Sequence, residues 1–417
     1  MTKVKREKKV ENEQPIKKVN TINKKSRRQR KKDRAAKKKS NKVKKQISIK
    51  SEINNYNYNK ENNKKVKSRS NTNKNAEIPF LIGLENPGTT CYMNATLQCF
   101  NHVERLRQAL LREETYKILE LNKKEDKKLS FAFAEVLQNL WLNKKKECYS
   151  PIYFKQVISE MNHLYDGYSA NDSKDLILFL LENLHKELNI KKNIVQNNND
   201  NFIPDPTNFY EIYNEFKKNY VNLNDSIISQ EFYGYNNIKT QCTKCQTIIH
   251  NVQVYNIIFF PLEEIRKYKN YPINTQVKIS DCFDYNQKIN IYESFYCNFC
   301  NSRCKAQSQT LLIDAPKTLI INLNRGMGKQ FNINIKLEES INIKPYIGNN
   351  SRIYNYELIG VLSHYGPNST GGHFISFCKN SVNGNWYSYD DFEVDLSSFK
   401  EVCSRGIIIW KSKYNDL

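Results

Sequence analysis

Charged and apolar residues are segregated along this chain, and the segregation limits which part of it can fold. Residues 1–76 hold 28 Lys and Arg against 6 Asp and Glu, and they contain no aromatic residue before Tyr56. A segment so highly charged and so poor in apolar side chains cannot bury enough surface to offset the entropy lost on ordering. We therefore predict a disordered basic tail over 1–76 and a folded body over 77–417.

The tail carries nearly all of the chain's net charge of +23, so the body is close to neutral. Its basic cluster over 24–39 is typical of a signal for the nucleus or nucleolus that an import receptor reads, and it also suits weak contact with nucleic-acid phosphates. The simpler alternative is a solvated low-complexity leader. No apolar run reaches the roughly 18 residues of a membrane span, so we expect no membrane partner.

The spacing of apolar residues changes along the body. From His102 to about Leu188 the apolar spacing is mostly helical, and Asn171 or Asp172 can cap a helix with Leu176, Leu180 and Leu184 on its apolar face. Residues 190–225 are polar and turn-rich, which indicates an insertion or loop. After Ser229, short β-rich runs such as "TLIINLN" and "GIIIW" alternate with turns. Helices followed by strands predict an α+β fold.

Eleven cysteines in a chain without an apparent export signal favour a reducing compartment, where cysteines act as thiols, nucleophiles or metal ligands. Two C-x-x-C pairs, Cys242 with Cys245 and Cys297 with Cys300, supply four thiolates for one structural zinc ion. The long separation of the pairs places them at the tips of two hairpins. Cys304 and His250 are close enough in sequence to replace a ligand, and four free thiols are the alternative.

Cys91 lies in "ENPGTTCYMN", where a Pro-Gly turn and two threonines lead into a helical pattern. The free amides and the dipole of a helix N-terminus lower the pKa of a thiol there. Alone, Cys91 is more simply explained as a buried structural cysteine. His373 follows two glycines on a predicted strand, and Asp390 and Asp391 end the next one. That hairpin supplies a base and a carboxylate to orient it. We expect His364 to be a solvent-side or loop histidine.

These segments resemble the ubiquitin-specific proteases. Residues 83–100, "GLENPGTTCYMNATLQCF", are similar to the cysteine box of that family, and "GGHFISFCKNSVNGNWYSYDDFEV" over 371–394 is similar to its histidine box. Further similar segments include "DSKDLILFLLENLHKELN" and "EFYGYNNIKTQCTKC". The resemblance covers about residues 80–415, which is essentially the whole body.

The resemblance implies a papain-like cysteine peptidase fold with a helical thumb, a β palm and zinc-tipped β fingers over about 229–310. It implies Cys91 as nucleophile, His373 as general base and Asp390 as the residue that orients the imidazole. Asn86 corresponds to the side chain that stabilises the oxyanion. Asp391 corresponds to an acidic position with an auxiliary role.

The activity implied is deubiquitination: Cys-His-Asp hydrolysis of the (iso)peptide bond after the C-terminal glycine of ubiquitin, through a thioester. Ubiquitin and ubiquitinated proteins are then the partners. Three alternatives remain: a catalytically silent ubiquitin-binding scaffold, a nucleic-acid-binding protein acting through its tail, and a hydrolase of a ubiquitin-like modifier. The complete triad argues against the first, and the neutral body argues against any nucleic-acid binding outside the tail.

Overall fold

The computed structural model describes most of the body of this chain. The described residues are 81–142, 148–167, 169–191, 203–325, 333–348, 351–368, 371–402 and 406–413. All of them belong to the second of two compact units, Ala76–Leu417. The predicted disordered tail over 1–76 lies outside the described residues, so it stays a prediction.

The first part of the body is a group of helices packed around α2. They are α2 (Cys91–Asn101), α3 (Glu104–Leu111), α4 (Glu113–Asn122), α5 (Lys128–Leu142), α6 (Ile152–Met161), the 3-10 turn η1 (His163–Tyr165), α7 (Ser173–Leu188) and α9 (Ile227–Phe232). The prediction of helices between His102 and Leu188 is confirmed. Asp172 is the N-cap of α7, where its carboxylate accepts a hydrogen bond from the Lys174 amide at 2.8 Å.

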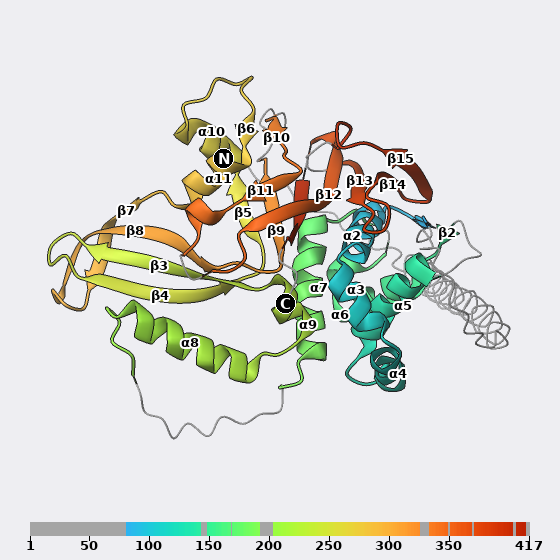
Figure 1. Ribbon diagram of the computed structural model, residues 1–417, viewed down its shortest axis with the longest axis horizontal. Helices are drawn as coiled ribbons and strands as arrows, with labels where there is room; N and C mark the ends of the chain where they lie inside the picture. Colours follow the sequence, from blue (N-terminus) through green and yellow to red (C-terminus); the bar gives the residue numbers. More distant parts are fainter. Residues whose placement is uncertain are drawn as a thin grey trace, which may run out of the picture. The chain divides into compact units, whose positions relative to one another are not determined.

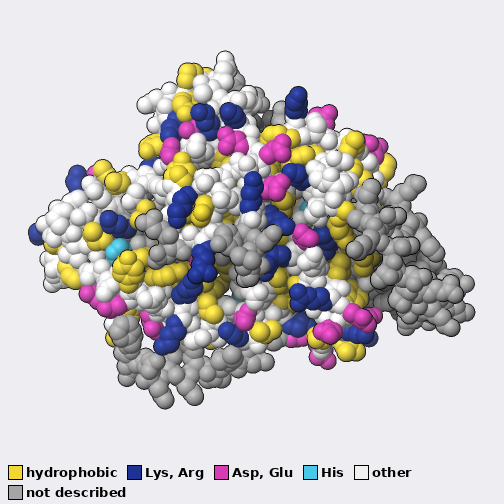
Figure 2. Space-filling model, in the orientation of Figure 1, with side chains coloured by type: hydrophobic (Ala, Val, Ile, Leu, Met, Phe, Trp, Pro, Cys, Tyr) yellow, Lys and Arg dark blue, Asp and Glu magenta, His cyan; other side chains and the backbone are white. Residues whose placement is uncertain are grey.

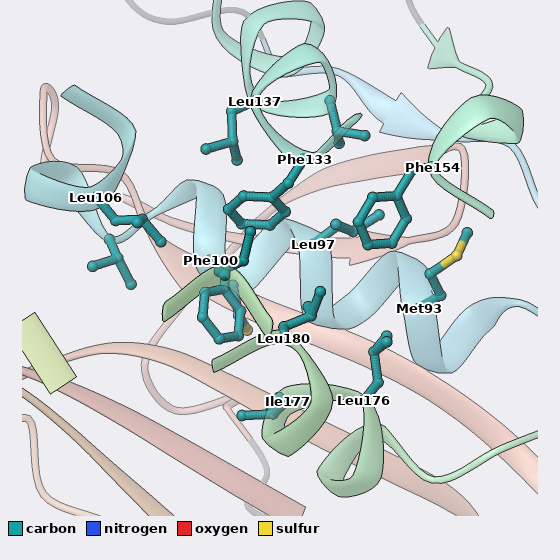
Figure 3. Packing of buried hydrophobic residues seen from close by; sticks show 14 of the residues in the cluster. Met93, Leu97, Phe100, Leu106, Phe133, Leu137, Phe154, Leu176, Ile177 and Leu180 are labelled. Atoms are coloured by element: carbon teal, nitrogen blue, oxygen red, sulfur yellow. The ribbon is translucent and has the colours of Figure 1, made fainter. Parts of the chain in front are cut away.

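Helix α2 is the centre of this group, because every one of its residues is buried. Its apolar side chains meet those of α5, α6 and α7, as Figure 3 shows for Phe100 of α2, Phe133 of α5 and Leu180 of α7. A helix enclosed on all sides cannot shift without disrupting the core. Cys91, the first residue of α2, therefore occupies a fixed position.

An eight-stranded sheet packs against α2 through β13 and β12 (Figure 1). Seven strands follow the order β15-β14-β13-β12-β16-β9-β5, and β11 pairs with β12. The strands are β5 (Ile258–Pro261), β9 (Thr318–Asn324), β11 (Ser340–Asn342), β12 (Asn355–Asn368), β13 (Gly371–Lys379), β14 (Trp386–Asp390), β15 (Glu393–Ser397) and β16 (Gly406–Ser412). The predicted hairpin that joins the His373 segment to the Asp390 segment is the antiparallel pair β13–β14.

A separate four-stranded antiparallel sheet has the order β4-β3-β8-β7 (Figure 1). Its strands are β3 (Gly234–Cys242), β4 (Ile248–Tyr255), β7 (Asn290–Cys297) and β8 (Ser302–Asp314). The turns that join β3 to β4 and β7 to β8 carry the two C-x-x-C pairs, as the sequence predicted. Smaller elements complete the body: the parallel pairs β1 (Gly83–Leu84) with β2 (Cys148–Tyr149) and β6 (Val277–Lys278) with β10 (Ile335–Lys336), the helices α10 (Leu262–Tyr268) and α11 (Ile279–Asn286), and η3 (Lys344–Tyr346).

The interpretation of residues 190–225 as a turn-rich loop is wrong over α8 (Phe209–Leu223). Phe209, Tyr213, Phe216 and Tyr220 recur at helical spacing, and their rings pack on β3 and β4, three of them against Tyr235. The flanking Asn, Asp and Pro residues hid this apolar stripe among polar ones. Within the same interval, residues 192–202 lie outside the described part of the chain.

The surface of the body agrees with its low net charge. On the face that Figure 2 shows, Lys and Arg side chains are interspersed with Asp and Glu. Among the helices that the structure describes, none combines the length and apolar character needed to cross a bilayer.

Candidate active site

Cys91 opens α2 directly after an unusual turn. Gly88 has φ 147° and Thr89 has φ 48°, so two successive residues adopt positive φ. The Asn86 side chain organises this turn, because its Oδ1 accepts hydrogen bonds from the amide of Gly88 at 3.1 Å and from the amide and hydroxyl of Thr90, both at 3.0 Å. Thr90 is the N-cap by position, but its hydroxyl bonds Asn86 rather than a helix amide.

The pKa of the Cys91 thiol is raised, chiefly because burial disfavours the thiolate. The backbone N–H groups of Phe374, Tyr92 and Cys91 itself act in the opposite direction, and the nearby Asp391 carboxylate adds to the rise. The prediction that the helix N-terminus lowers the pKa of this thiol is therefore wrong for the structure as it stands. Backbone amides do lie close to the sulfur and lower its pKa. Cys91 is only 6% exposed, however, and the effect of burial on the pKa is larger than that of the amides.

His373 lies on β13, next to the residue whose amide faces Cys91. Its Nε2 is 2.5 Å from Oδ1 of Asp390 at the end of β14. When Nε2–H donates to the carboxylate, Nδ1 carries the lone pair that can accept a proton. Both side chains are about two-fifths exposed, so a substrate can reach them. The structure thus brings Cys91, His373 and Asp390 to one edge between α2 and the large sheet.

Asp391 joins three segments at this edge. Its Oδ2 accepts from Asn86 Nδ2 at 2.8 Å, its Oδ1 accepts from Asn94 Nδ2 at 2.7 Å, and its carbonyl accepts from the Leu84 amide at 2.7 Å. We call Asn86, Asn94 and Asp391 the Asp391 clamp. It ties the turn before Cys91 and the first turns of α2 to the turn that follows Asp390. Asp391 has φ 52°, a conformation that the surrounding hydrogen bonds hold in place.

Asn94 is a site residue that sequence reasoning missed. It lies one helical turn after Cys91 and is 2% exposed, so it shares a face of α2 with the nucleophile candidate. Its Nδ2 also contacts the carbonyl oxygens of Glu85 at 3.2 Å and Leu84 at 3.4 Å. A polar residue three positions after Cys91 was the available signal, but the partner turn could not be identified without the fold.

The turn after Asp391 approaches β1 so closely that a side chain would not fit between them. A Cβ at Gly83 would lie 2.1 Å from the carbonyl oxygen of Phe392. Glycine at position 83 therefore allows the backbone of the turn after Asp391 to pack beside the segment that leads to Asn86.

His364 is not a solvent-side or loop histidine, contrary to expectation. It is half-buried on β12, its ring lies 4.7 Å from that of Phe374, and burial lowers the pKa of its imidazole. A Cβ on Gly372 would come within 2.4 Å of His364 Nε2. Glycine at position 372 thus allows close packing against His364.

The four predicted metal ligands come together at the end of the four-stranded sheet. The sulfur atoms of Cys242, Cys245, Cys297 and Cys300 all lie within 4.8 Å of one another. Tetrahedral zinc with Zn–S bonds of about 2.3 Å requires sulfur atoms about 3.8 Å apart. The Cys242–Cys300 and Cys245–Cys297 distances are both 3.7 Å. The four-thiol cluster is therefore suited to hold a zinc ion.

The two alternative ligands differ in where they lie. His250 is on β4, where its Nδ1 is 2.8 Å from Asn237 Nδ2 and its ring packs on Phe209, so it does not belong to the cluster. Cys304 on β8 does reach the cluster, with its sulfur 3.2 Å from that of Cys242. The backbone amide of Cys245 lowers the pKa of Cys242 to about 6, whereas the interaction with Cys242 raises the pKa of Cys304 to about 11.

Comparison with known proteins identifies the family. Residues 82–410 match the family model described as "Ubiquitin carboxyl-terminal hydrolase". The chain belongs to the ubiquitin carboxyl-terminal hydrolase family. This membership confirms the resemblance to ubiquitin-specific proteases that the cysteine and histidine boxes indicated.

Relatives within this family share about a quarter of their aligned residues with the chain. Ubiquitin carboxyl-terminal hydrolase 2 from Bos taurus is 25% identical over 334 residues, which covers 77% of this chain and 53% of that protein. Ubiquitin carboxyl-terminal hydrolase Usp2 from Drosophila melanogaster is 25% identical over 325 residues, covering 75% of this chain and 32% of that protein. The chain thus spans about half the length, or less, of these curated relatives.

Solved structures share the fold. The Ubp8/Sgf11/Sus1/Sgf73 DUB module of SAGA bound to ubiquitin aldehyde matches with a TM-score of 0.60 at 21% identity, covering 83% of this chain and 72% of that chain. A yeast SAGA DUB module with an Sgf73 mutation matches with a TM-score of 0.61 at 20% identity, over 84% and 73% of the two chains. The predicted α+β, papain-like fold with helical thumb, β palm and β fingers is confirmed.

Proposed function

We propose that this chain is a thiol-dependent deubiquitinase, which hydrolyses the (iso)peptide bond after the C-terminal glycine of ubiquitin. Family membership supports this reaction class. The strongest support is the pair formed by His373 of β13 and Asp390 at the end of β14, because β13 also brings the Phe374 amide to Cys91 at the start of a buried helix. A nucleophile, a base and an orienting carboxylate are the parts that acyl transfer requires.

In the proposed reaction, Nδ1 of His373 takes the proton of the Cys91 thiol as the sulfur attacks the carbonyl carbon. Since burial raises the pKa of Cys91, the resting thiol is neutral and needs this base. Asp390 holds the imidazole through Nε2 and stabilises its charged form. His373 then protonates the leaving amine, and water hydrolyses the resulting thioester.

The oxyanion of the tetrahedral intermediate needs donors on the same side as the sulfur. We assign the backbone N–H of Cys91 and the Asn86 side chain to this role. One hydrogen of Asn86 Nδ2 is directed to Asp391, and its Oδ1 is fixed by the turn, so the side chain is held beside Cys91. The second hydrogen of Nδ2 is the donor that we propose for the oxyanion. Asp391 then has the auxiliary role of positioning Asn86.

We also propose that the four-thiol cluster binds one structural zinc ion. Four thiolates leave no open coordination position, so the ion would join the tips of the β fingers and take no part in the chemistry. Metal analysis of the purified protein tests this proposal, with one zinc per chain expected from the 3.7 Å sulfur separations. Purified, folded protein without zinc would refute it.

Ubiquitin and ubiquitinated proteins are the partners that this function implies, and they remain proposals for this chain. The basic tail is proposed to direct the protein to the nucleus or nucleolus, through an import receptor or weak nucleic-acid contact. Neither proposal affects the assignment of Cys91, His373 and Asp390.

Turnover of a fluorogenic amide at the C-terminus of ubiquitin tests the function. We expect Cys91→Ala to abolish turnover while leaving ubiquitin binding close to that of the wild type, because the substitution removes a small, nearly buried sulfur. Cys148→Ala is the control, since Cys148 is a half-buried cysteine on β2 and is not one of the proposed catalytic residues. Wild-type protein that binds ubiquitin without cleaving it would favour the silent scaffold, and cleavage of a ubiquitin-like modifier alone would change the substrate.

A further inference from the structure

The proposed zinc site has a fifth thiol beside it. Cys304 follows the second C-x-x-C pair by four residues, at the start of β8. Its sulfur is 3.2 Å from that of Cys242 and 3.6 Å from the carbonyl oxygen of Phe295 on the neighbouring strand β7. Cys304 does not belong to the four described cysteines whose sulfur atoms all lie within 4.8 Å of one another.

The sulfur–sulfur distances distinguish the cysteines that can bind one zinc ion from Cys304, which lies beside them. Two thiolates on one tetrahedral zinc ion stay about 3.8 Å apart, because each is about 2.3 Å from the metal. The 3.7 Å pairs, Cys242–Cys300 and Cys245–Cys297, meet this condition. At 3.2 Å, Cys242 and Cys304 are too close to be ligands of the same ion. The separation of their sulfur atoms exceeds the length of a disulfide bond by only about 1 Å.

Backbone register explains this proximity. Cys242, the last residue of β3, pairs with Ala306 of β8, and Cys304 is two residues away from Ala306 on the same strand. Side chains two residues apart point to the same face of a sheet, so Cys304 and Cys242 share a face as diagonal neighbours. A register irregularity between Tyr292 and Phe295 on β7 lies directly beside Cys304. Bulges of this kind re-aim side chains.

A small oxidant can reach the pair from the Cys304 side, since Cys242 itself is only 1% exposed. Cys304 is half-buried. The adjacent strand β7 is exposed over most of its length. By contrast Cys99 and Cys378, a thiol pair at 3.7 Å outside the metal cluster, are enclosed in the main core.

We propose that Cys304 is the resolving thiol of a peroxide-sensitive zinc cluster, and that oxidation joins it to Cys242 in a disulfide with loss of the metal. This inference rests on the proposed zinc site and not on the deubiquitinase activity. The oxidant is a peroxide. The Cys242 thiolate attacks one peroxide oxygen and forms a sulfenic acid, while the other oxygen leaves as hydroxide. The Cys304 thiol then displaces the sulfenic hydroxyl, so that the disulfide forms and one water is released.

Loss of one ligand leaves three thiolates, which no longer enclose the ion. The two finger hairpins would then lose a zinc ion that the four thiolates hold between their tips. Because a disulfide is reducible, a dithiol reductant together with added zinc returns the cluster to its starting state. Cys304 is closer to Cys242 than Cys300 is, at 3.2 Å against 3.7 Å, so it is placed to capture the sulfenic acid before further oxidation to irreversible sulfinic and sulfonic acids.

The test compares zinc-loaded wild type, Cys304→Ser and Cys148→Ser after treatment with hydrogen peroxide. Released zinc is followed with a chromogenic chelator, and disulfides are mapped by mass spectrometry of the unreduced protein. We expect a Cys242–Cys304 linked peptide in the wild type and in Cys148→Ser, and recovery of zinc binding after reduction. In Cys304→Ser we expect no such peptide, and more irreversible sulfinic or sulfonic acid at Cys242 than in the wild type.

Cys304→Ala provides a second variant in case a serine disturbs the cluster, and both variants must bind zinc before oxidation as the wild type does. Equal recovery of zinc binding in the wild type and in both Cys304 variants would overturn the proposal. A disulfide map that pairs Cys242 with Cys245 or Cys300 in the wild type would also overturn it. Neither readout depends on ubiquitin hydrolysis, so failure here is distinguishable from failure of the proposed enzyme activity.

Discussion

At the scale of single residues, Asp391 contributes to the site in two opposing ways. Its carboxylate accepts hydrogen bonds from Asn86 and Asn94 and so fixes the turn before the nucleophile candidate. The same negative charge raises the pKa of the Cys91 thiol. The two effects can be distinguished by one substitution that removes only a hydrogen bond of Asp391 and another that removes only its charge.

Asn94→Ala removes one arm of the Asp391 clamp without changing any charge. We expect kcat/KM for a ubiquitin amide to fall by about tenfold, the cost of losing a hydrogen bond to a charged group, with the loss mainly in kcat. The pH dependence should keep its wild-type midpoint, because the charge around Cys91 is unchanged. A shifted midpoint, or unchanged kinetics in the folded variant, would contradict the positioning role.

Asp391→Asn removes the charge that disfavours the Cys91 thiolate. The pKa of Cys91 should fall, so the rate of Cys91 alkylation should rise at lower pH than in the wild type. Alkylation by iodoacetamide, measured across pH by mass spectrometry, gives the midpoint directly. Asp395→Asn is the matched control, since Asp395 is an exposed carboxylate on β15. A midpoint at higher pH than in the wild type would contradict the prediction that the Asp391 charge raises the pKa of Cys91.

Residue types and spacing were sufficient to predict Cys91, His373, Asp390 and the four metal-cluster cysteines as site candidates. Asn94 and the clamp were not predictable, because the partner of Asn94 depends on how the turn after β14 docks against β1. The raised pKa of Cys91 was missed for a related reason. Sequence places a thiol at a helix N-terminus, but only packing shows how far it is buried.

At the scale of elements, α5 contains a buried carboxyl group in the thumb. Glu135 is 6% exposed, and burial raises the pKa of its carboxyl from 4.5 to about 7. Below pH 4.5 this group is protonated in both the folded and the unfolded chain. Between those two values the unfolded chain releases the proton and the folded one keeps it, so the free energy of unfolding decreases as pH rises.

Glu135→Gln should therefore stabilise the protein more at pH 8 than at pH 5. The expected difference is about 3 kcal/mol at most, from the linkage between the pKa shift and stability. Denaturant unfolding at the two pH values measures it. Glu125→Gln, at an exposed position before α5, serves as control and should change little at either pH. Destabilisation of Glu135→Gln at pH 8 would mean that the carboxylate has a stabilising partner.

Helix α8 shows what element prediction missed and why. Its aromatic residues at 209, 213, 216 and 220 have clear helical spacing, and Asn208 caps the helix by accepting from the amides of Tyr210 and Glu211. Both signals were present in the sequence. They are obscured in the sequence because the surrounding segment is rich in Asn, Asp and Pro.

At the scale of the whole molecule, charge divides the chain into a basic tail and a nearly neutral body. Deletion of residues 1–76 should abolish nuclear accumulation and any nucleic-acid binding, but leave kcat/KM for ubiquitin amides unchanged. Localisation of the fluorescently tagged protein and salt-dependent RNA binding measure the first two effects. Equal RNA affinity in the shortened protein would place a nucleic-acid surface on the body.

Covalent capture by ubiquitin that carries a thiol-reactive group at its C-terminus would identify both the nucleophile and the modifier. We expect one adduct per chain, mapped to Cys91, in wild type and in Cys148→Ala. We expect no adduct in Cys91→Ala and much slower labelling in His373→Ala, where Cys91 lacks its general base. An adduct on another cysteine, or no adduct from folded wild-type protein, would contradict the assignment of Cys91 as the nucleophile of a deubiquitinase.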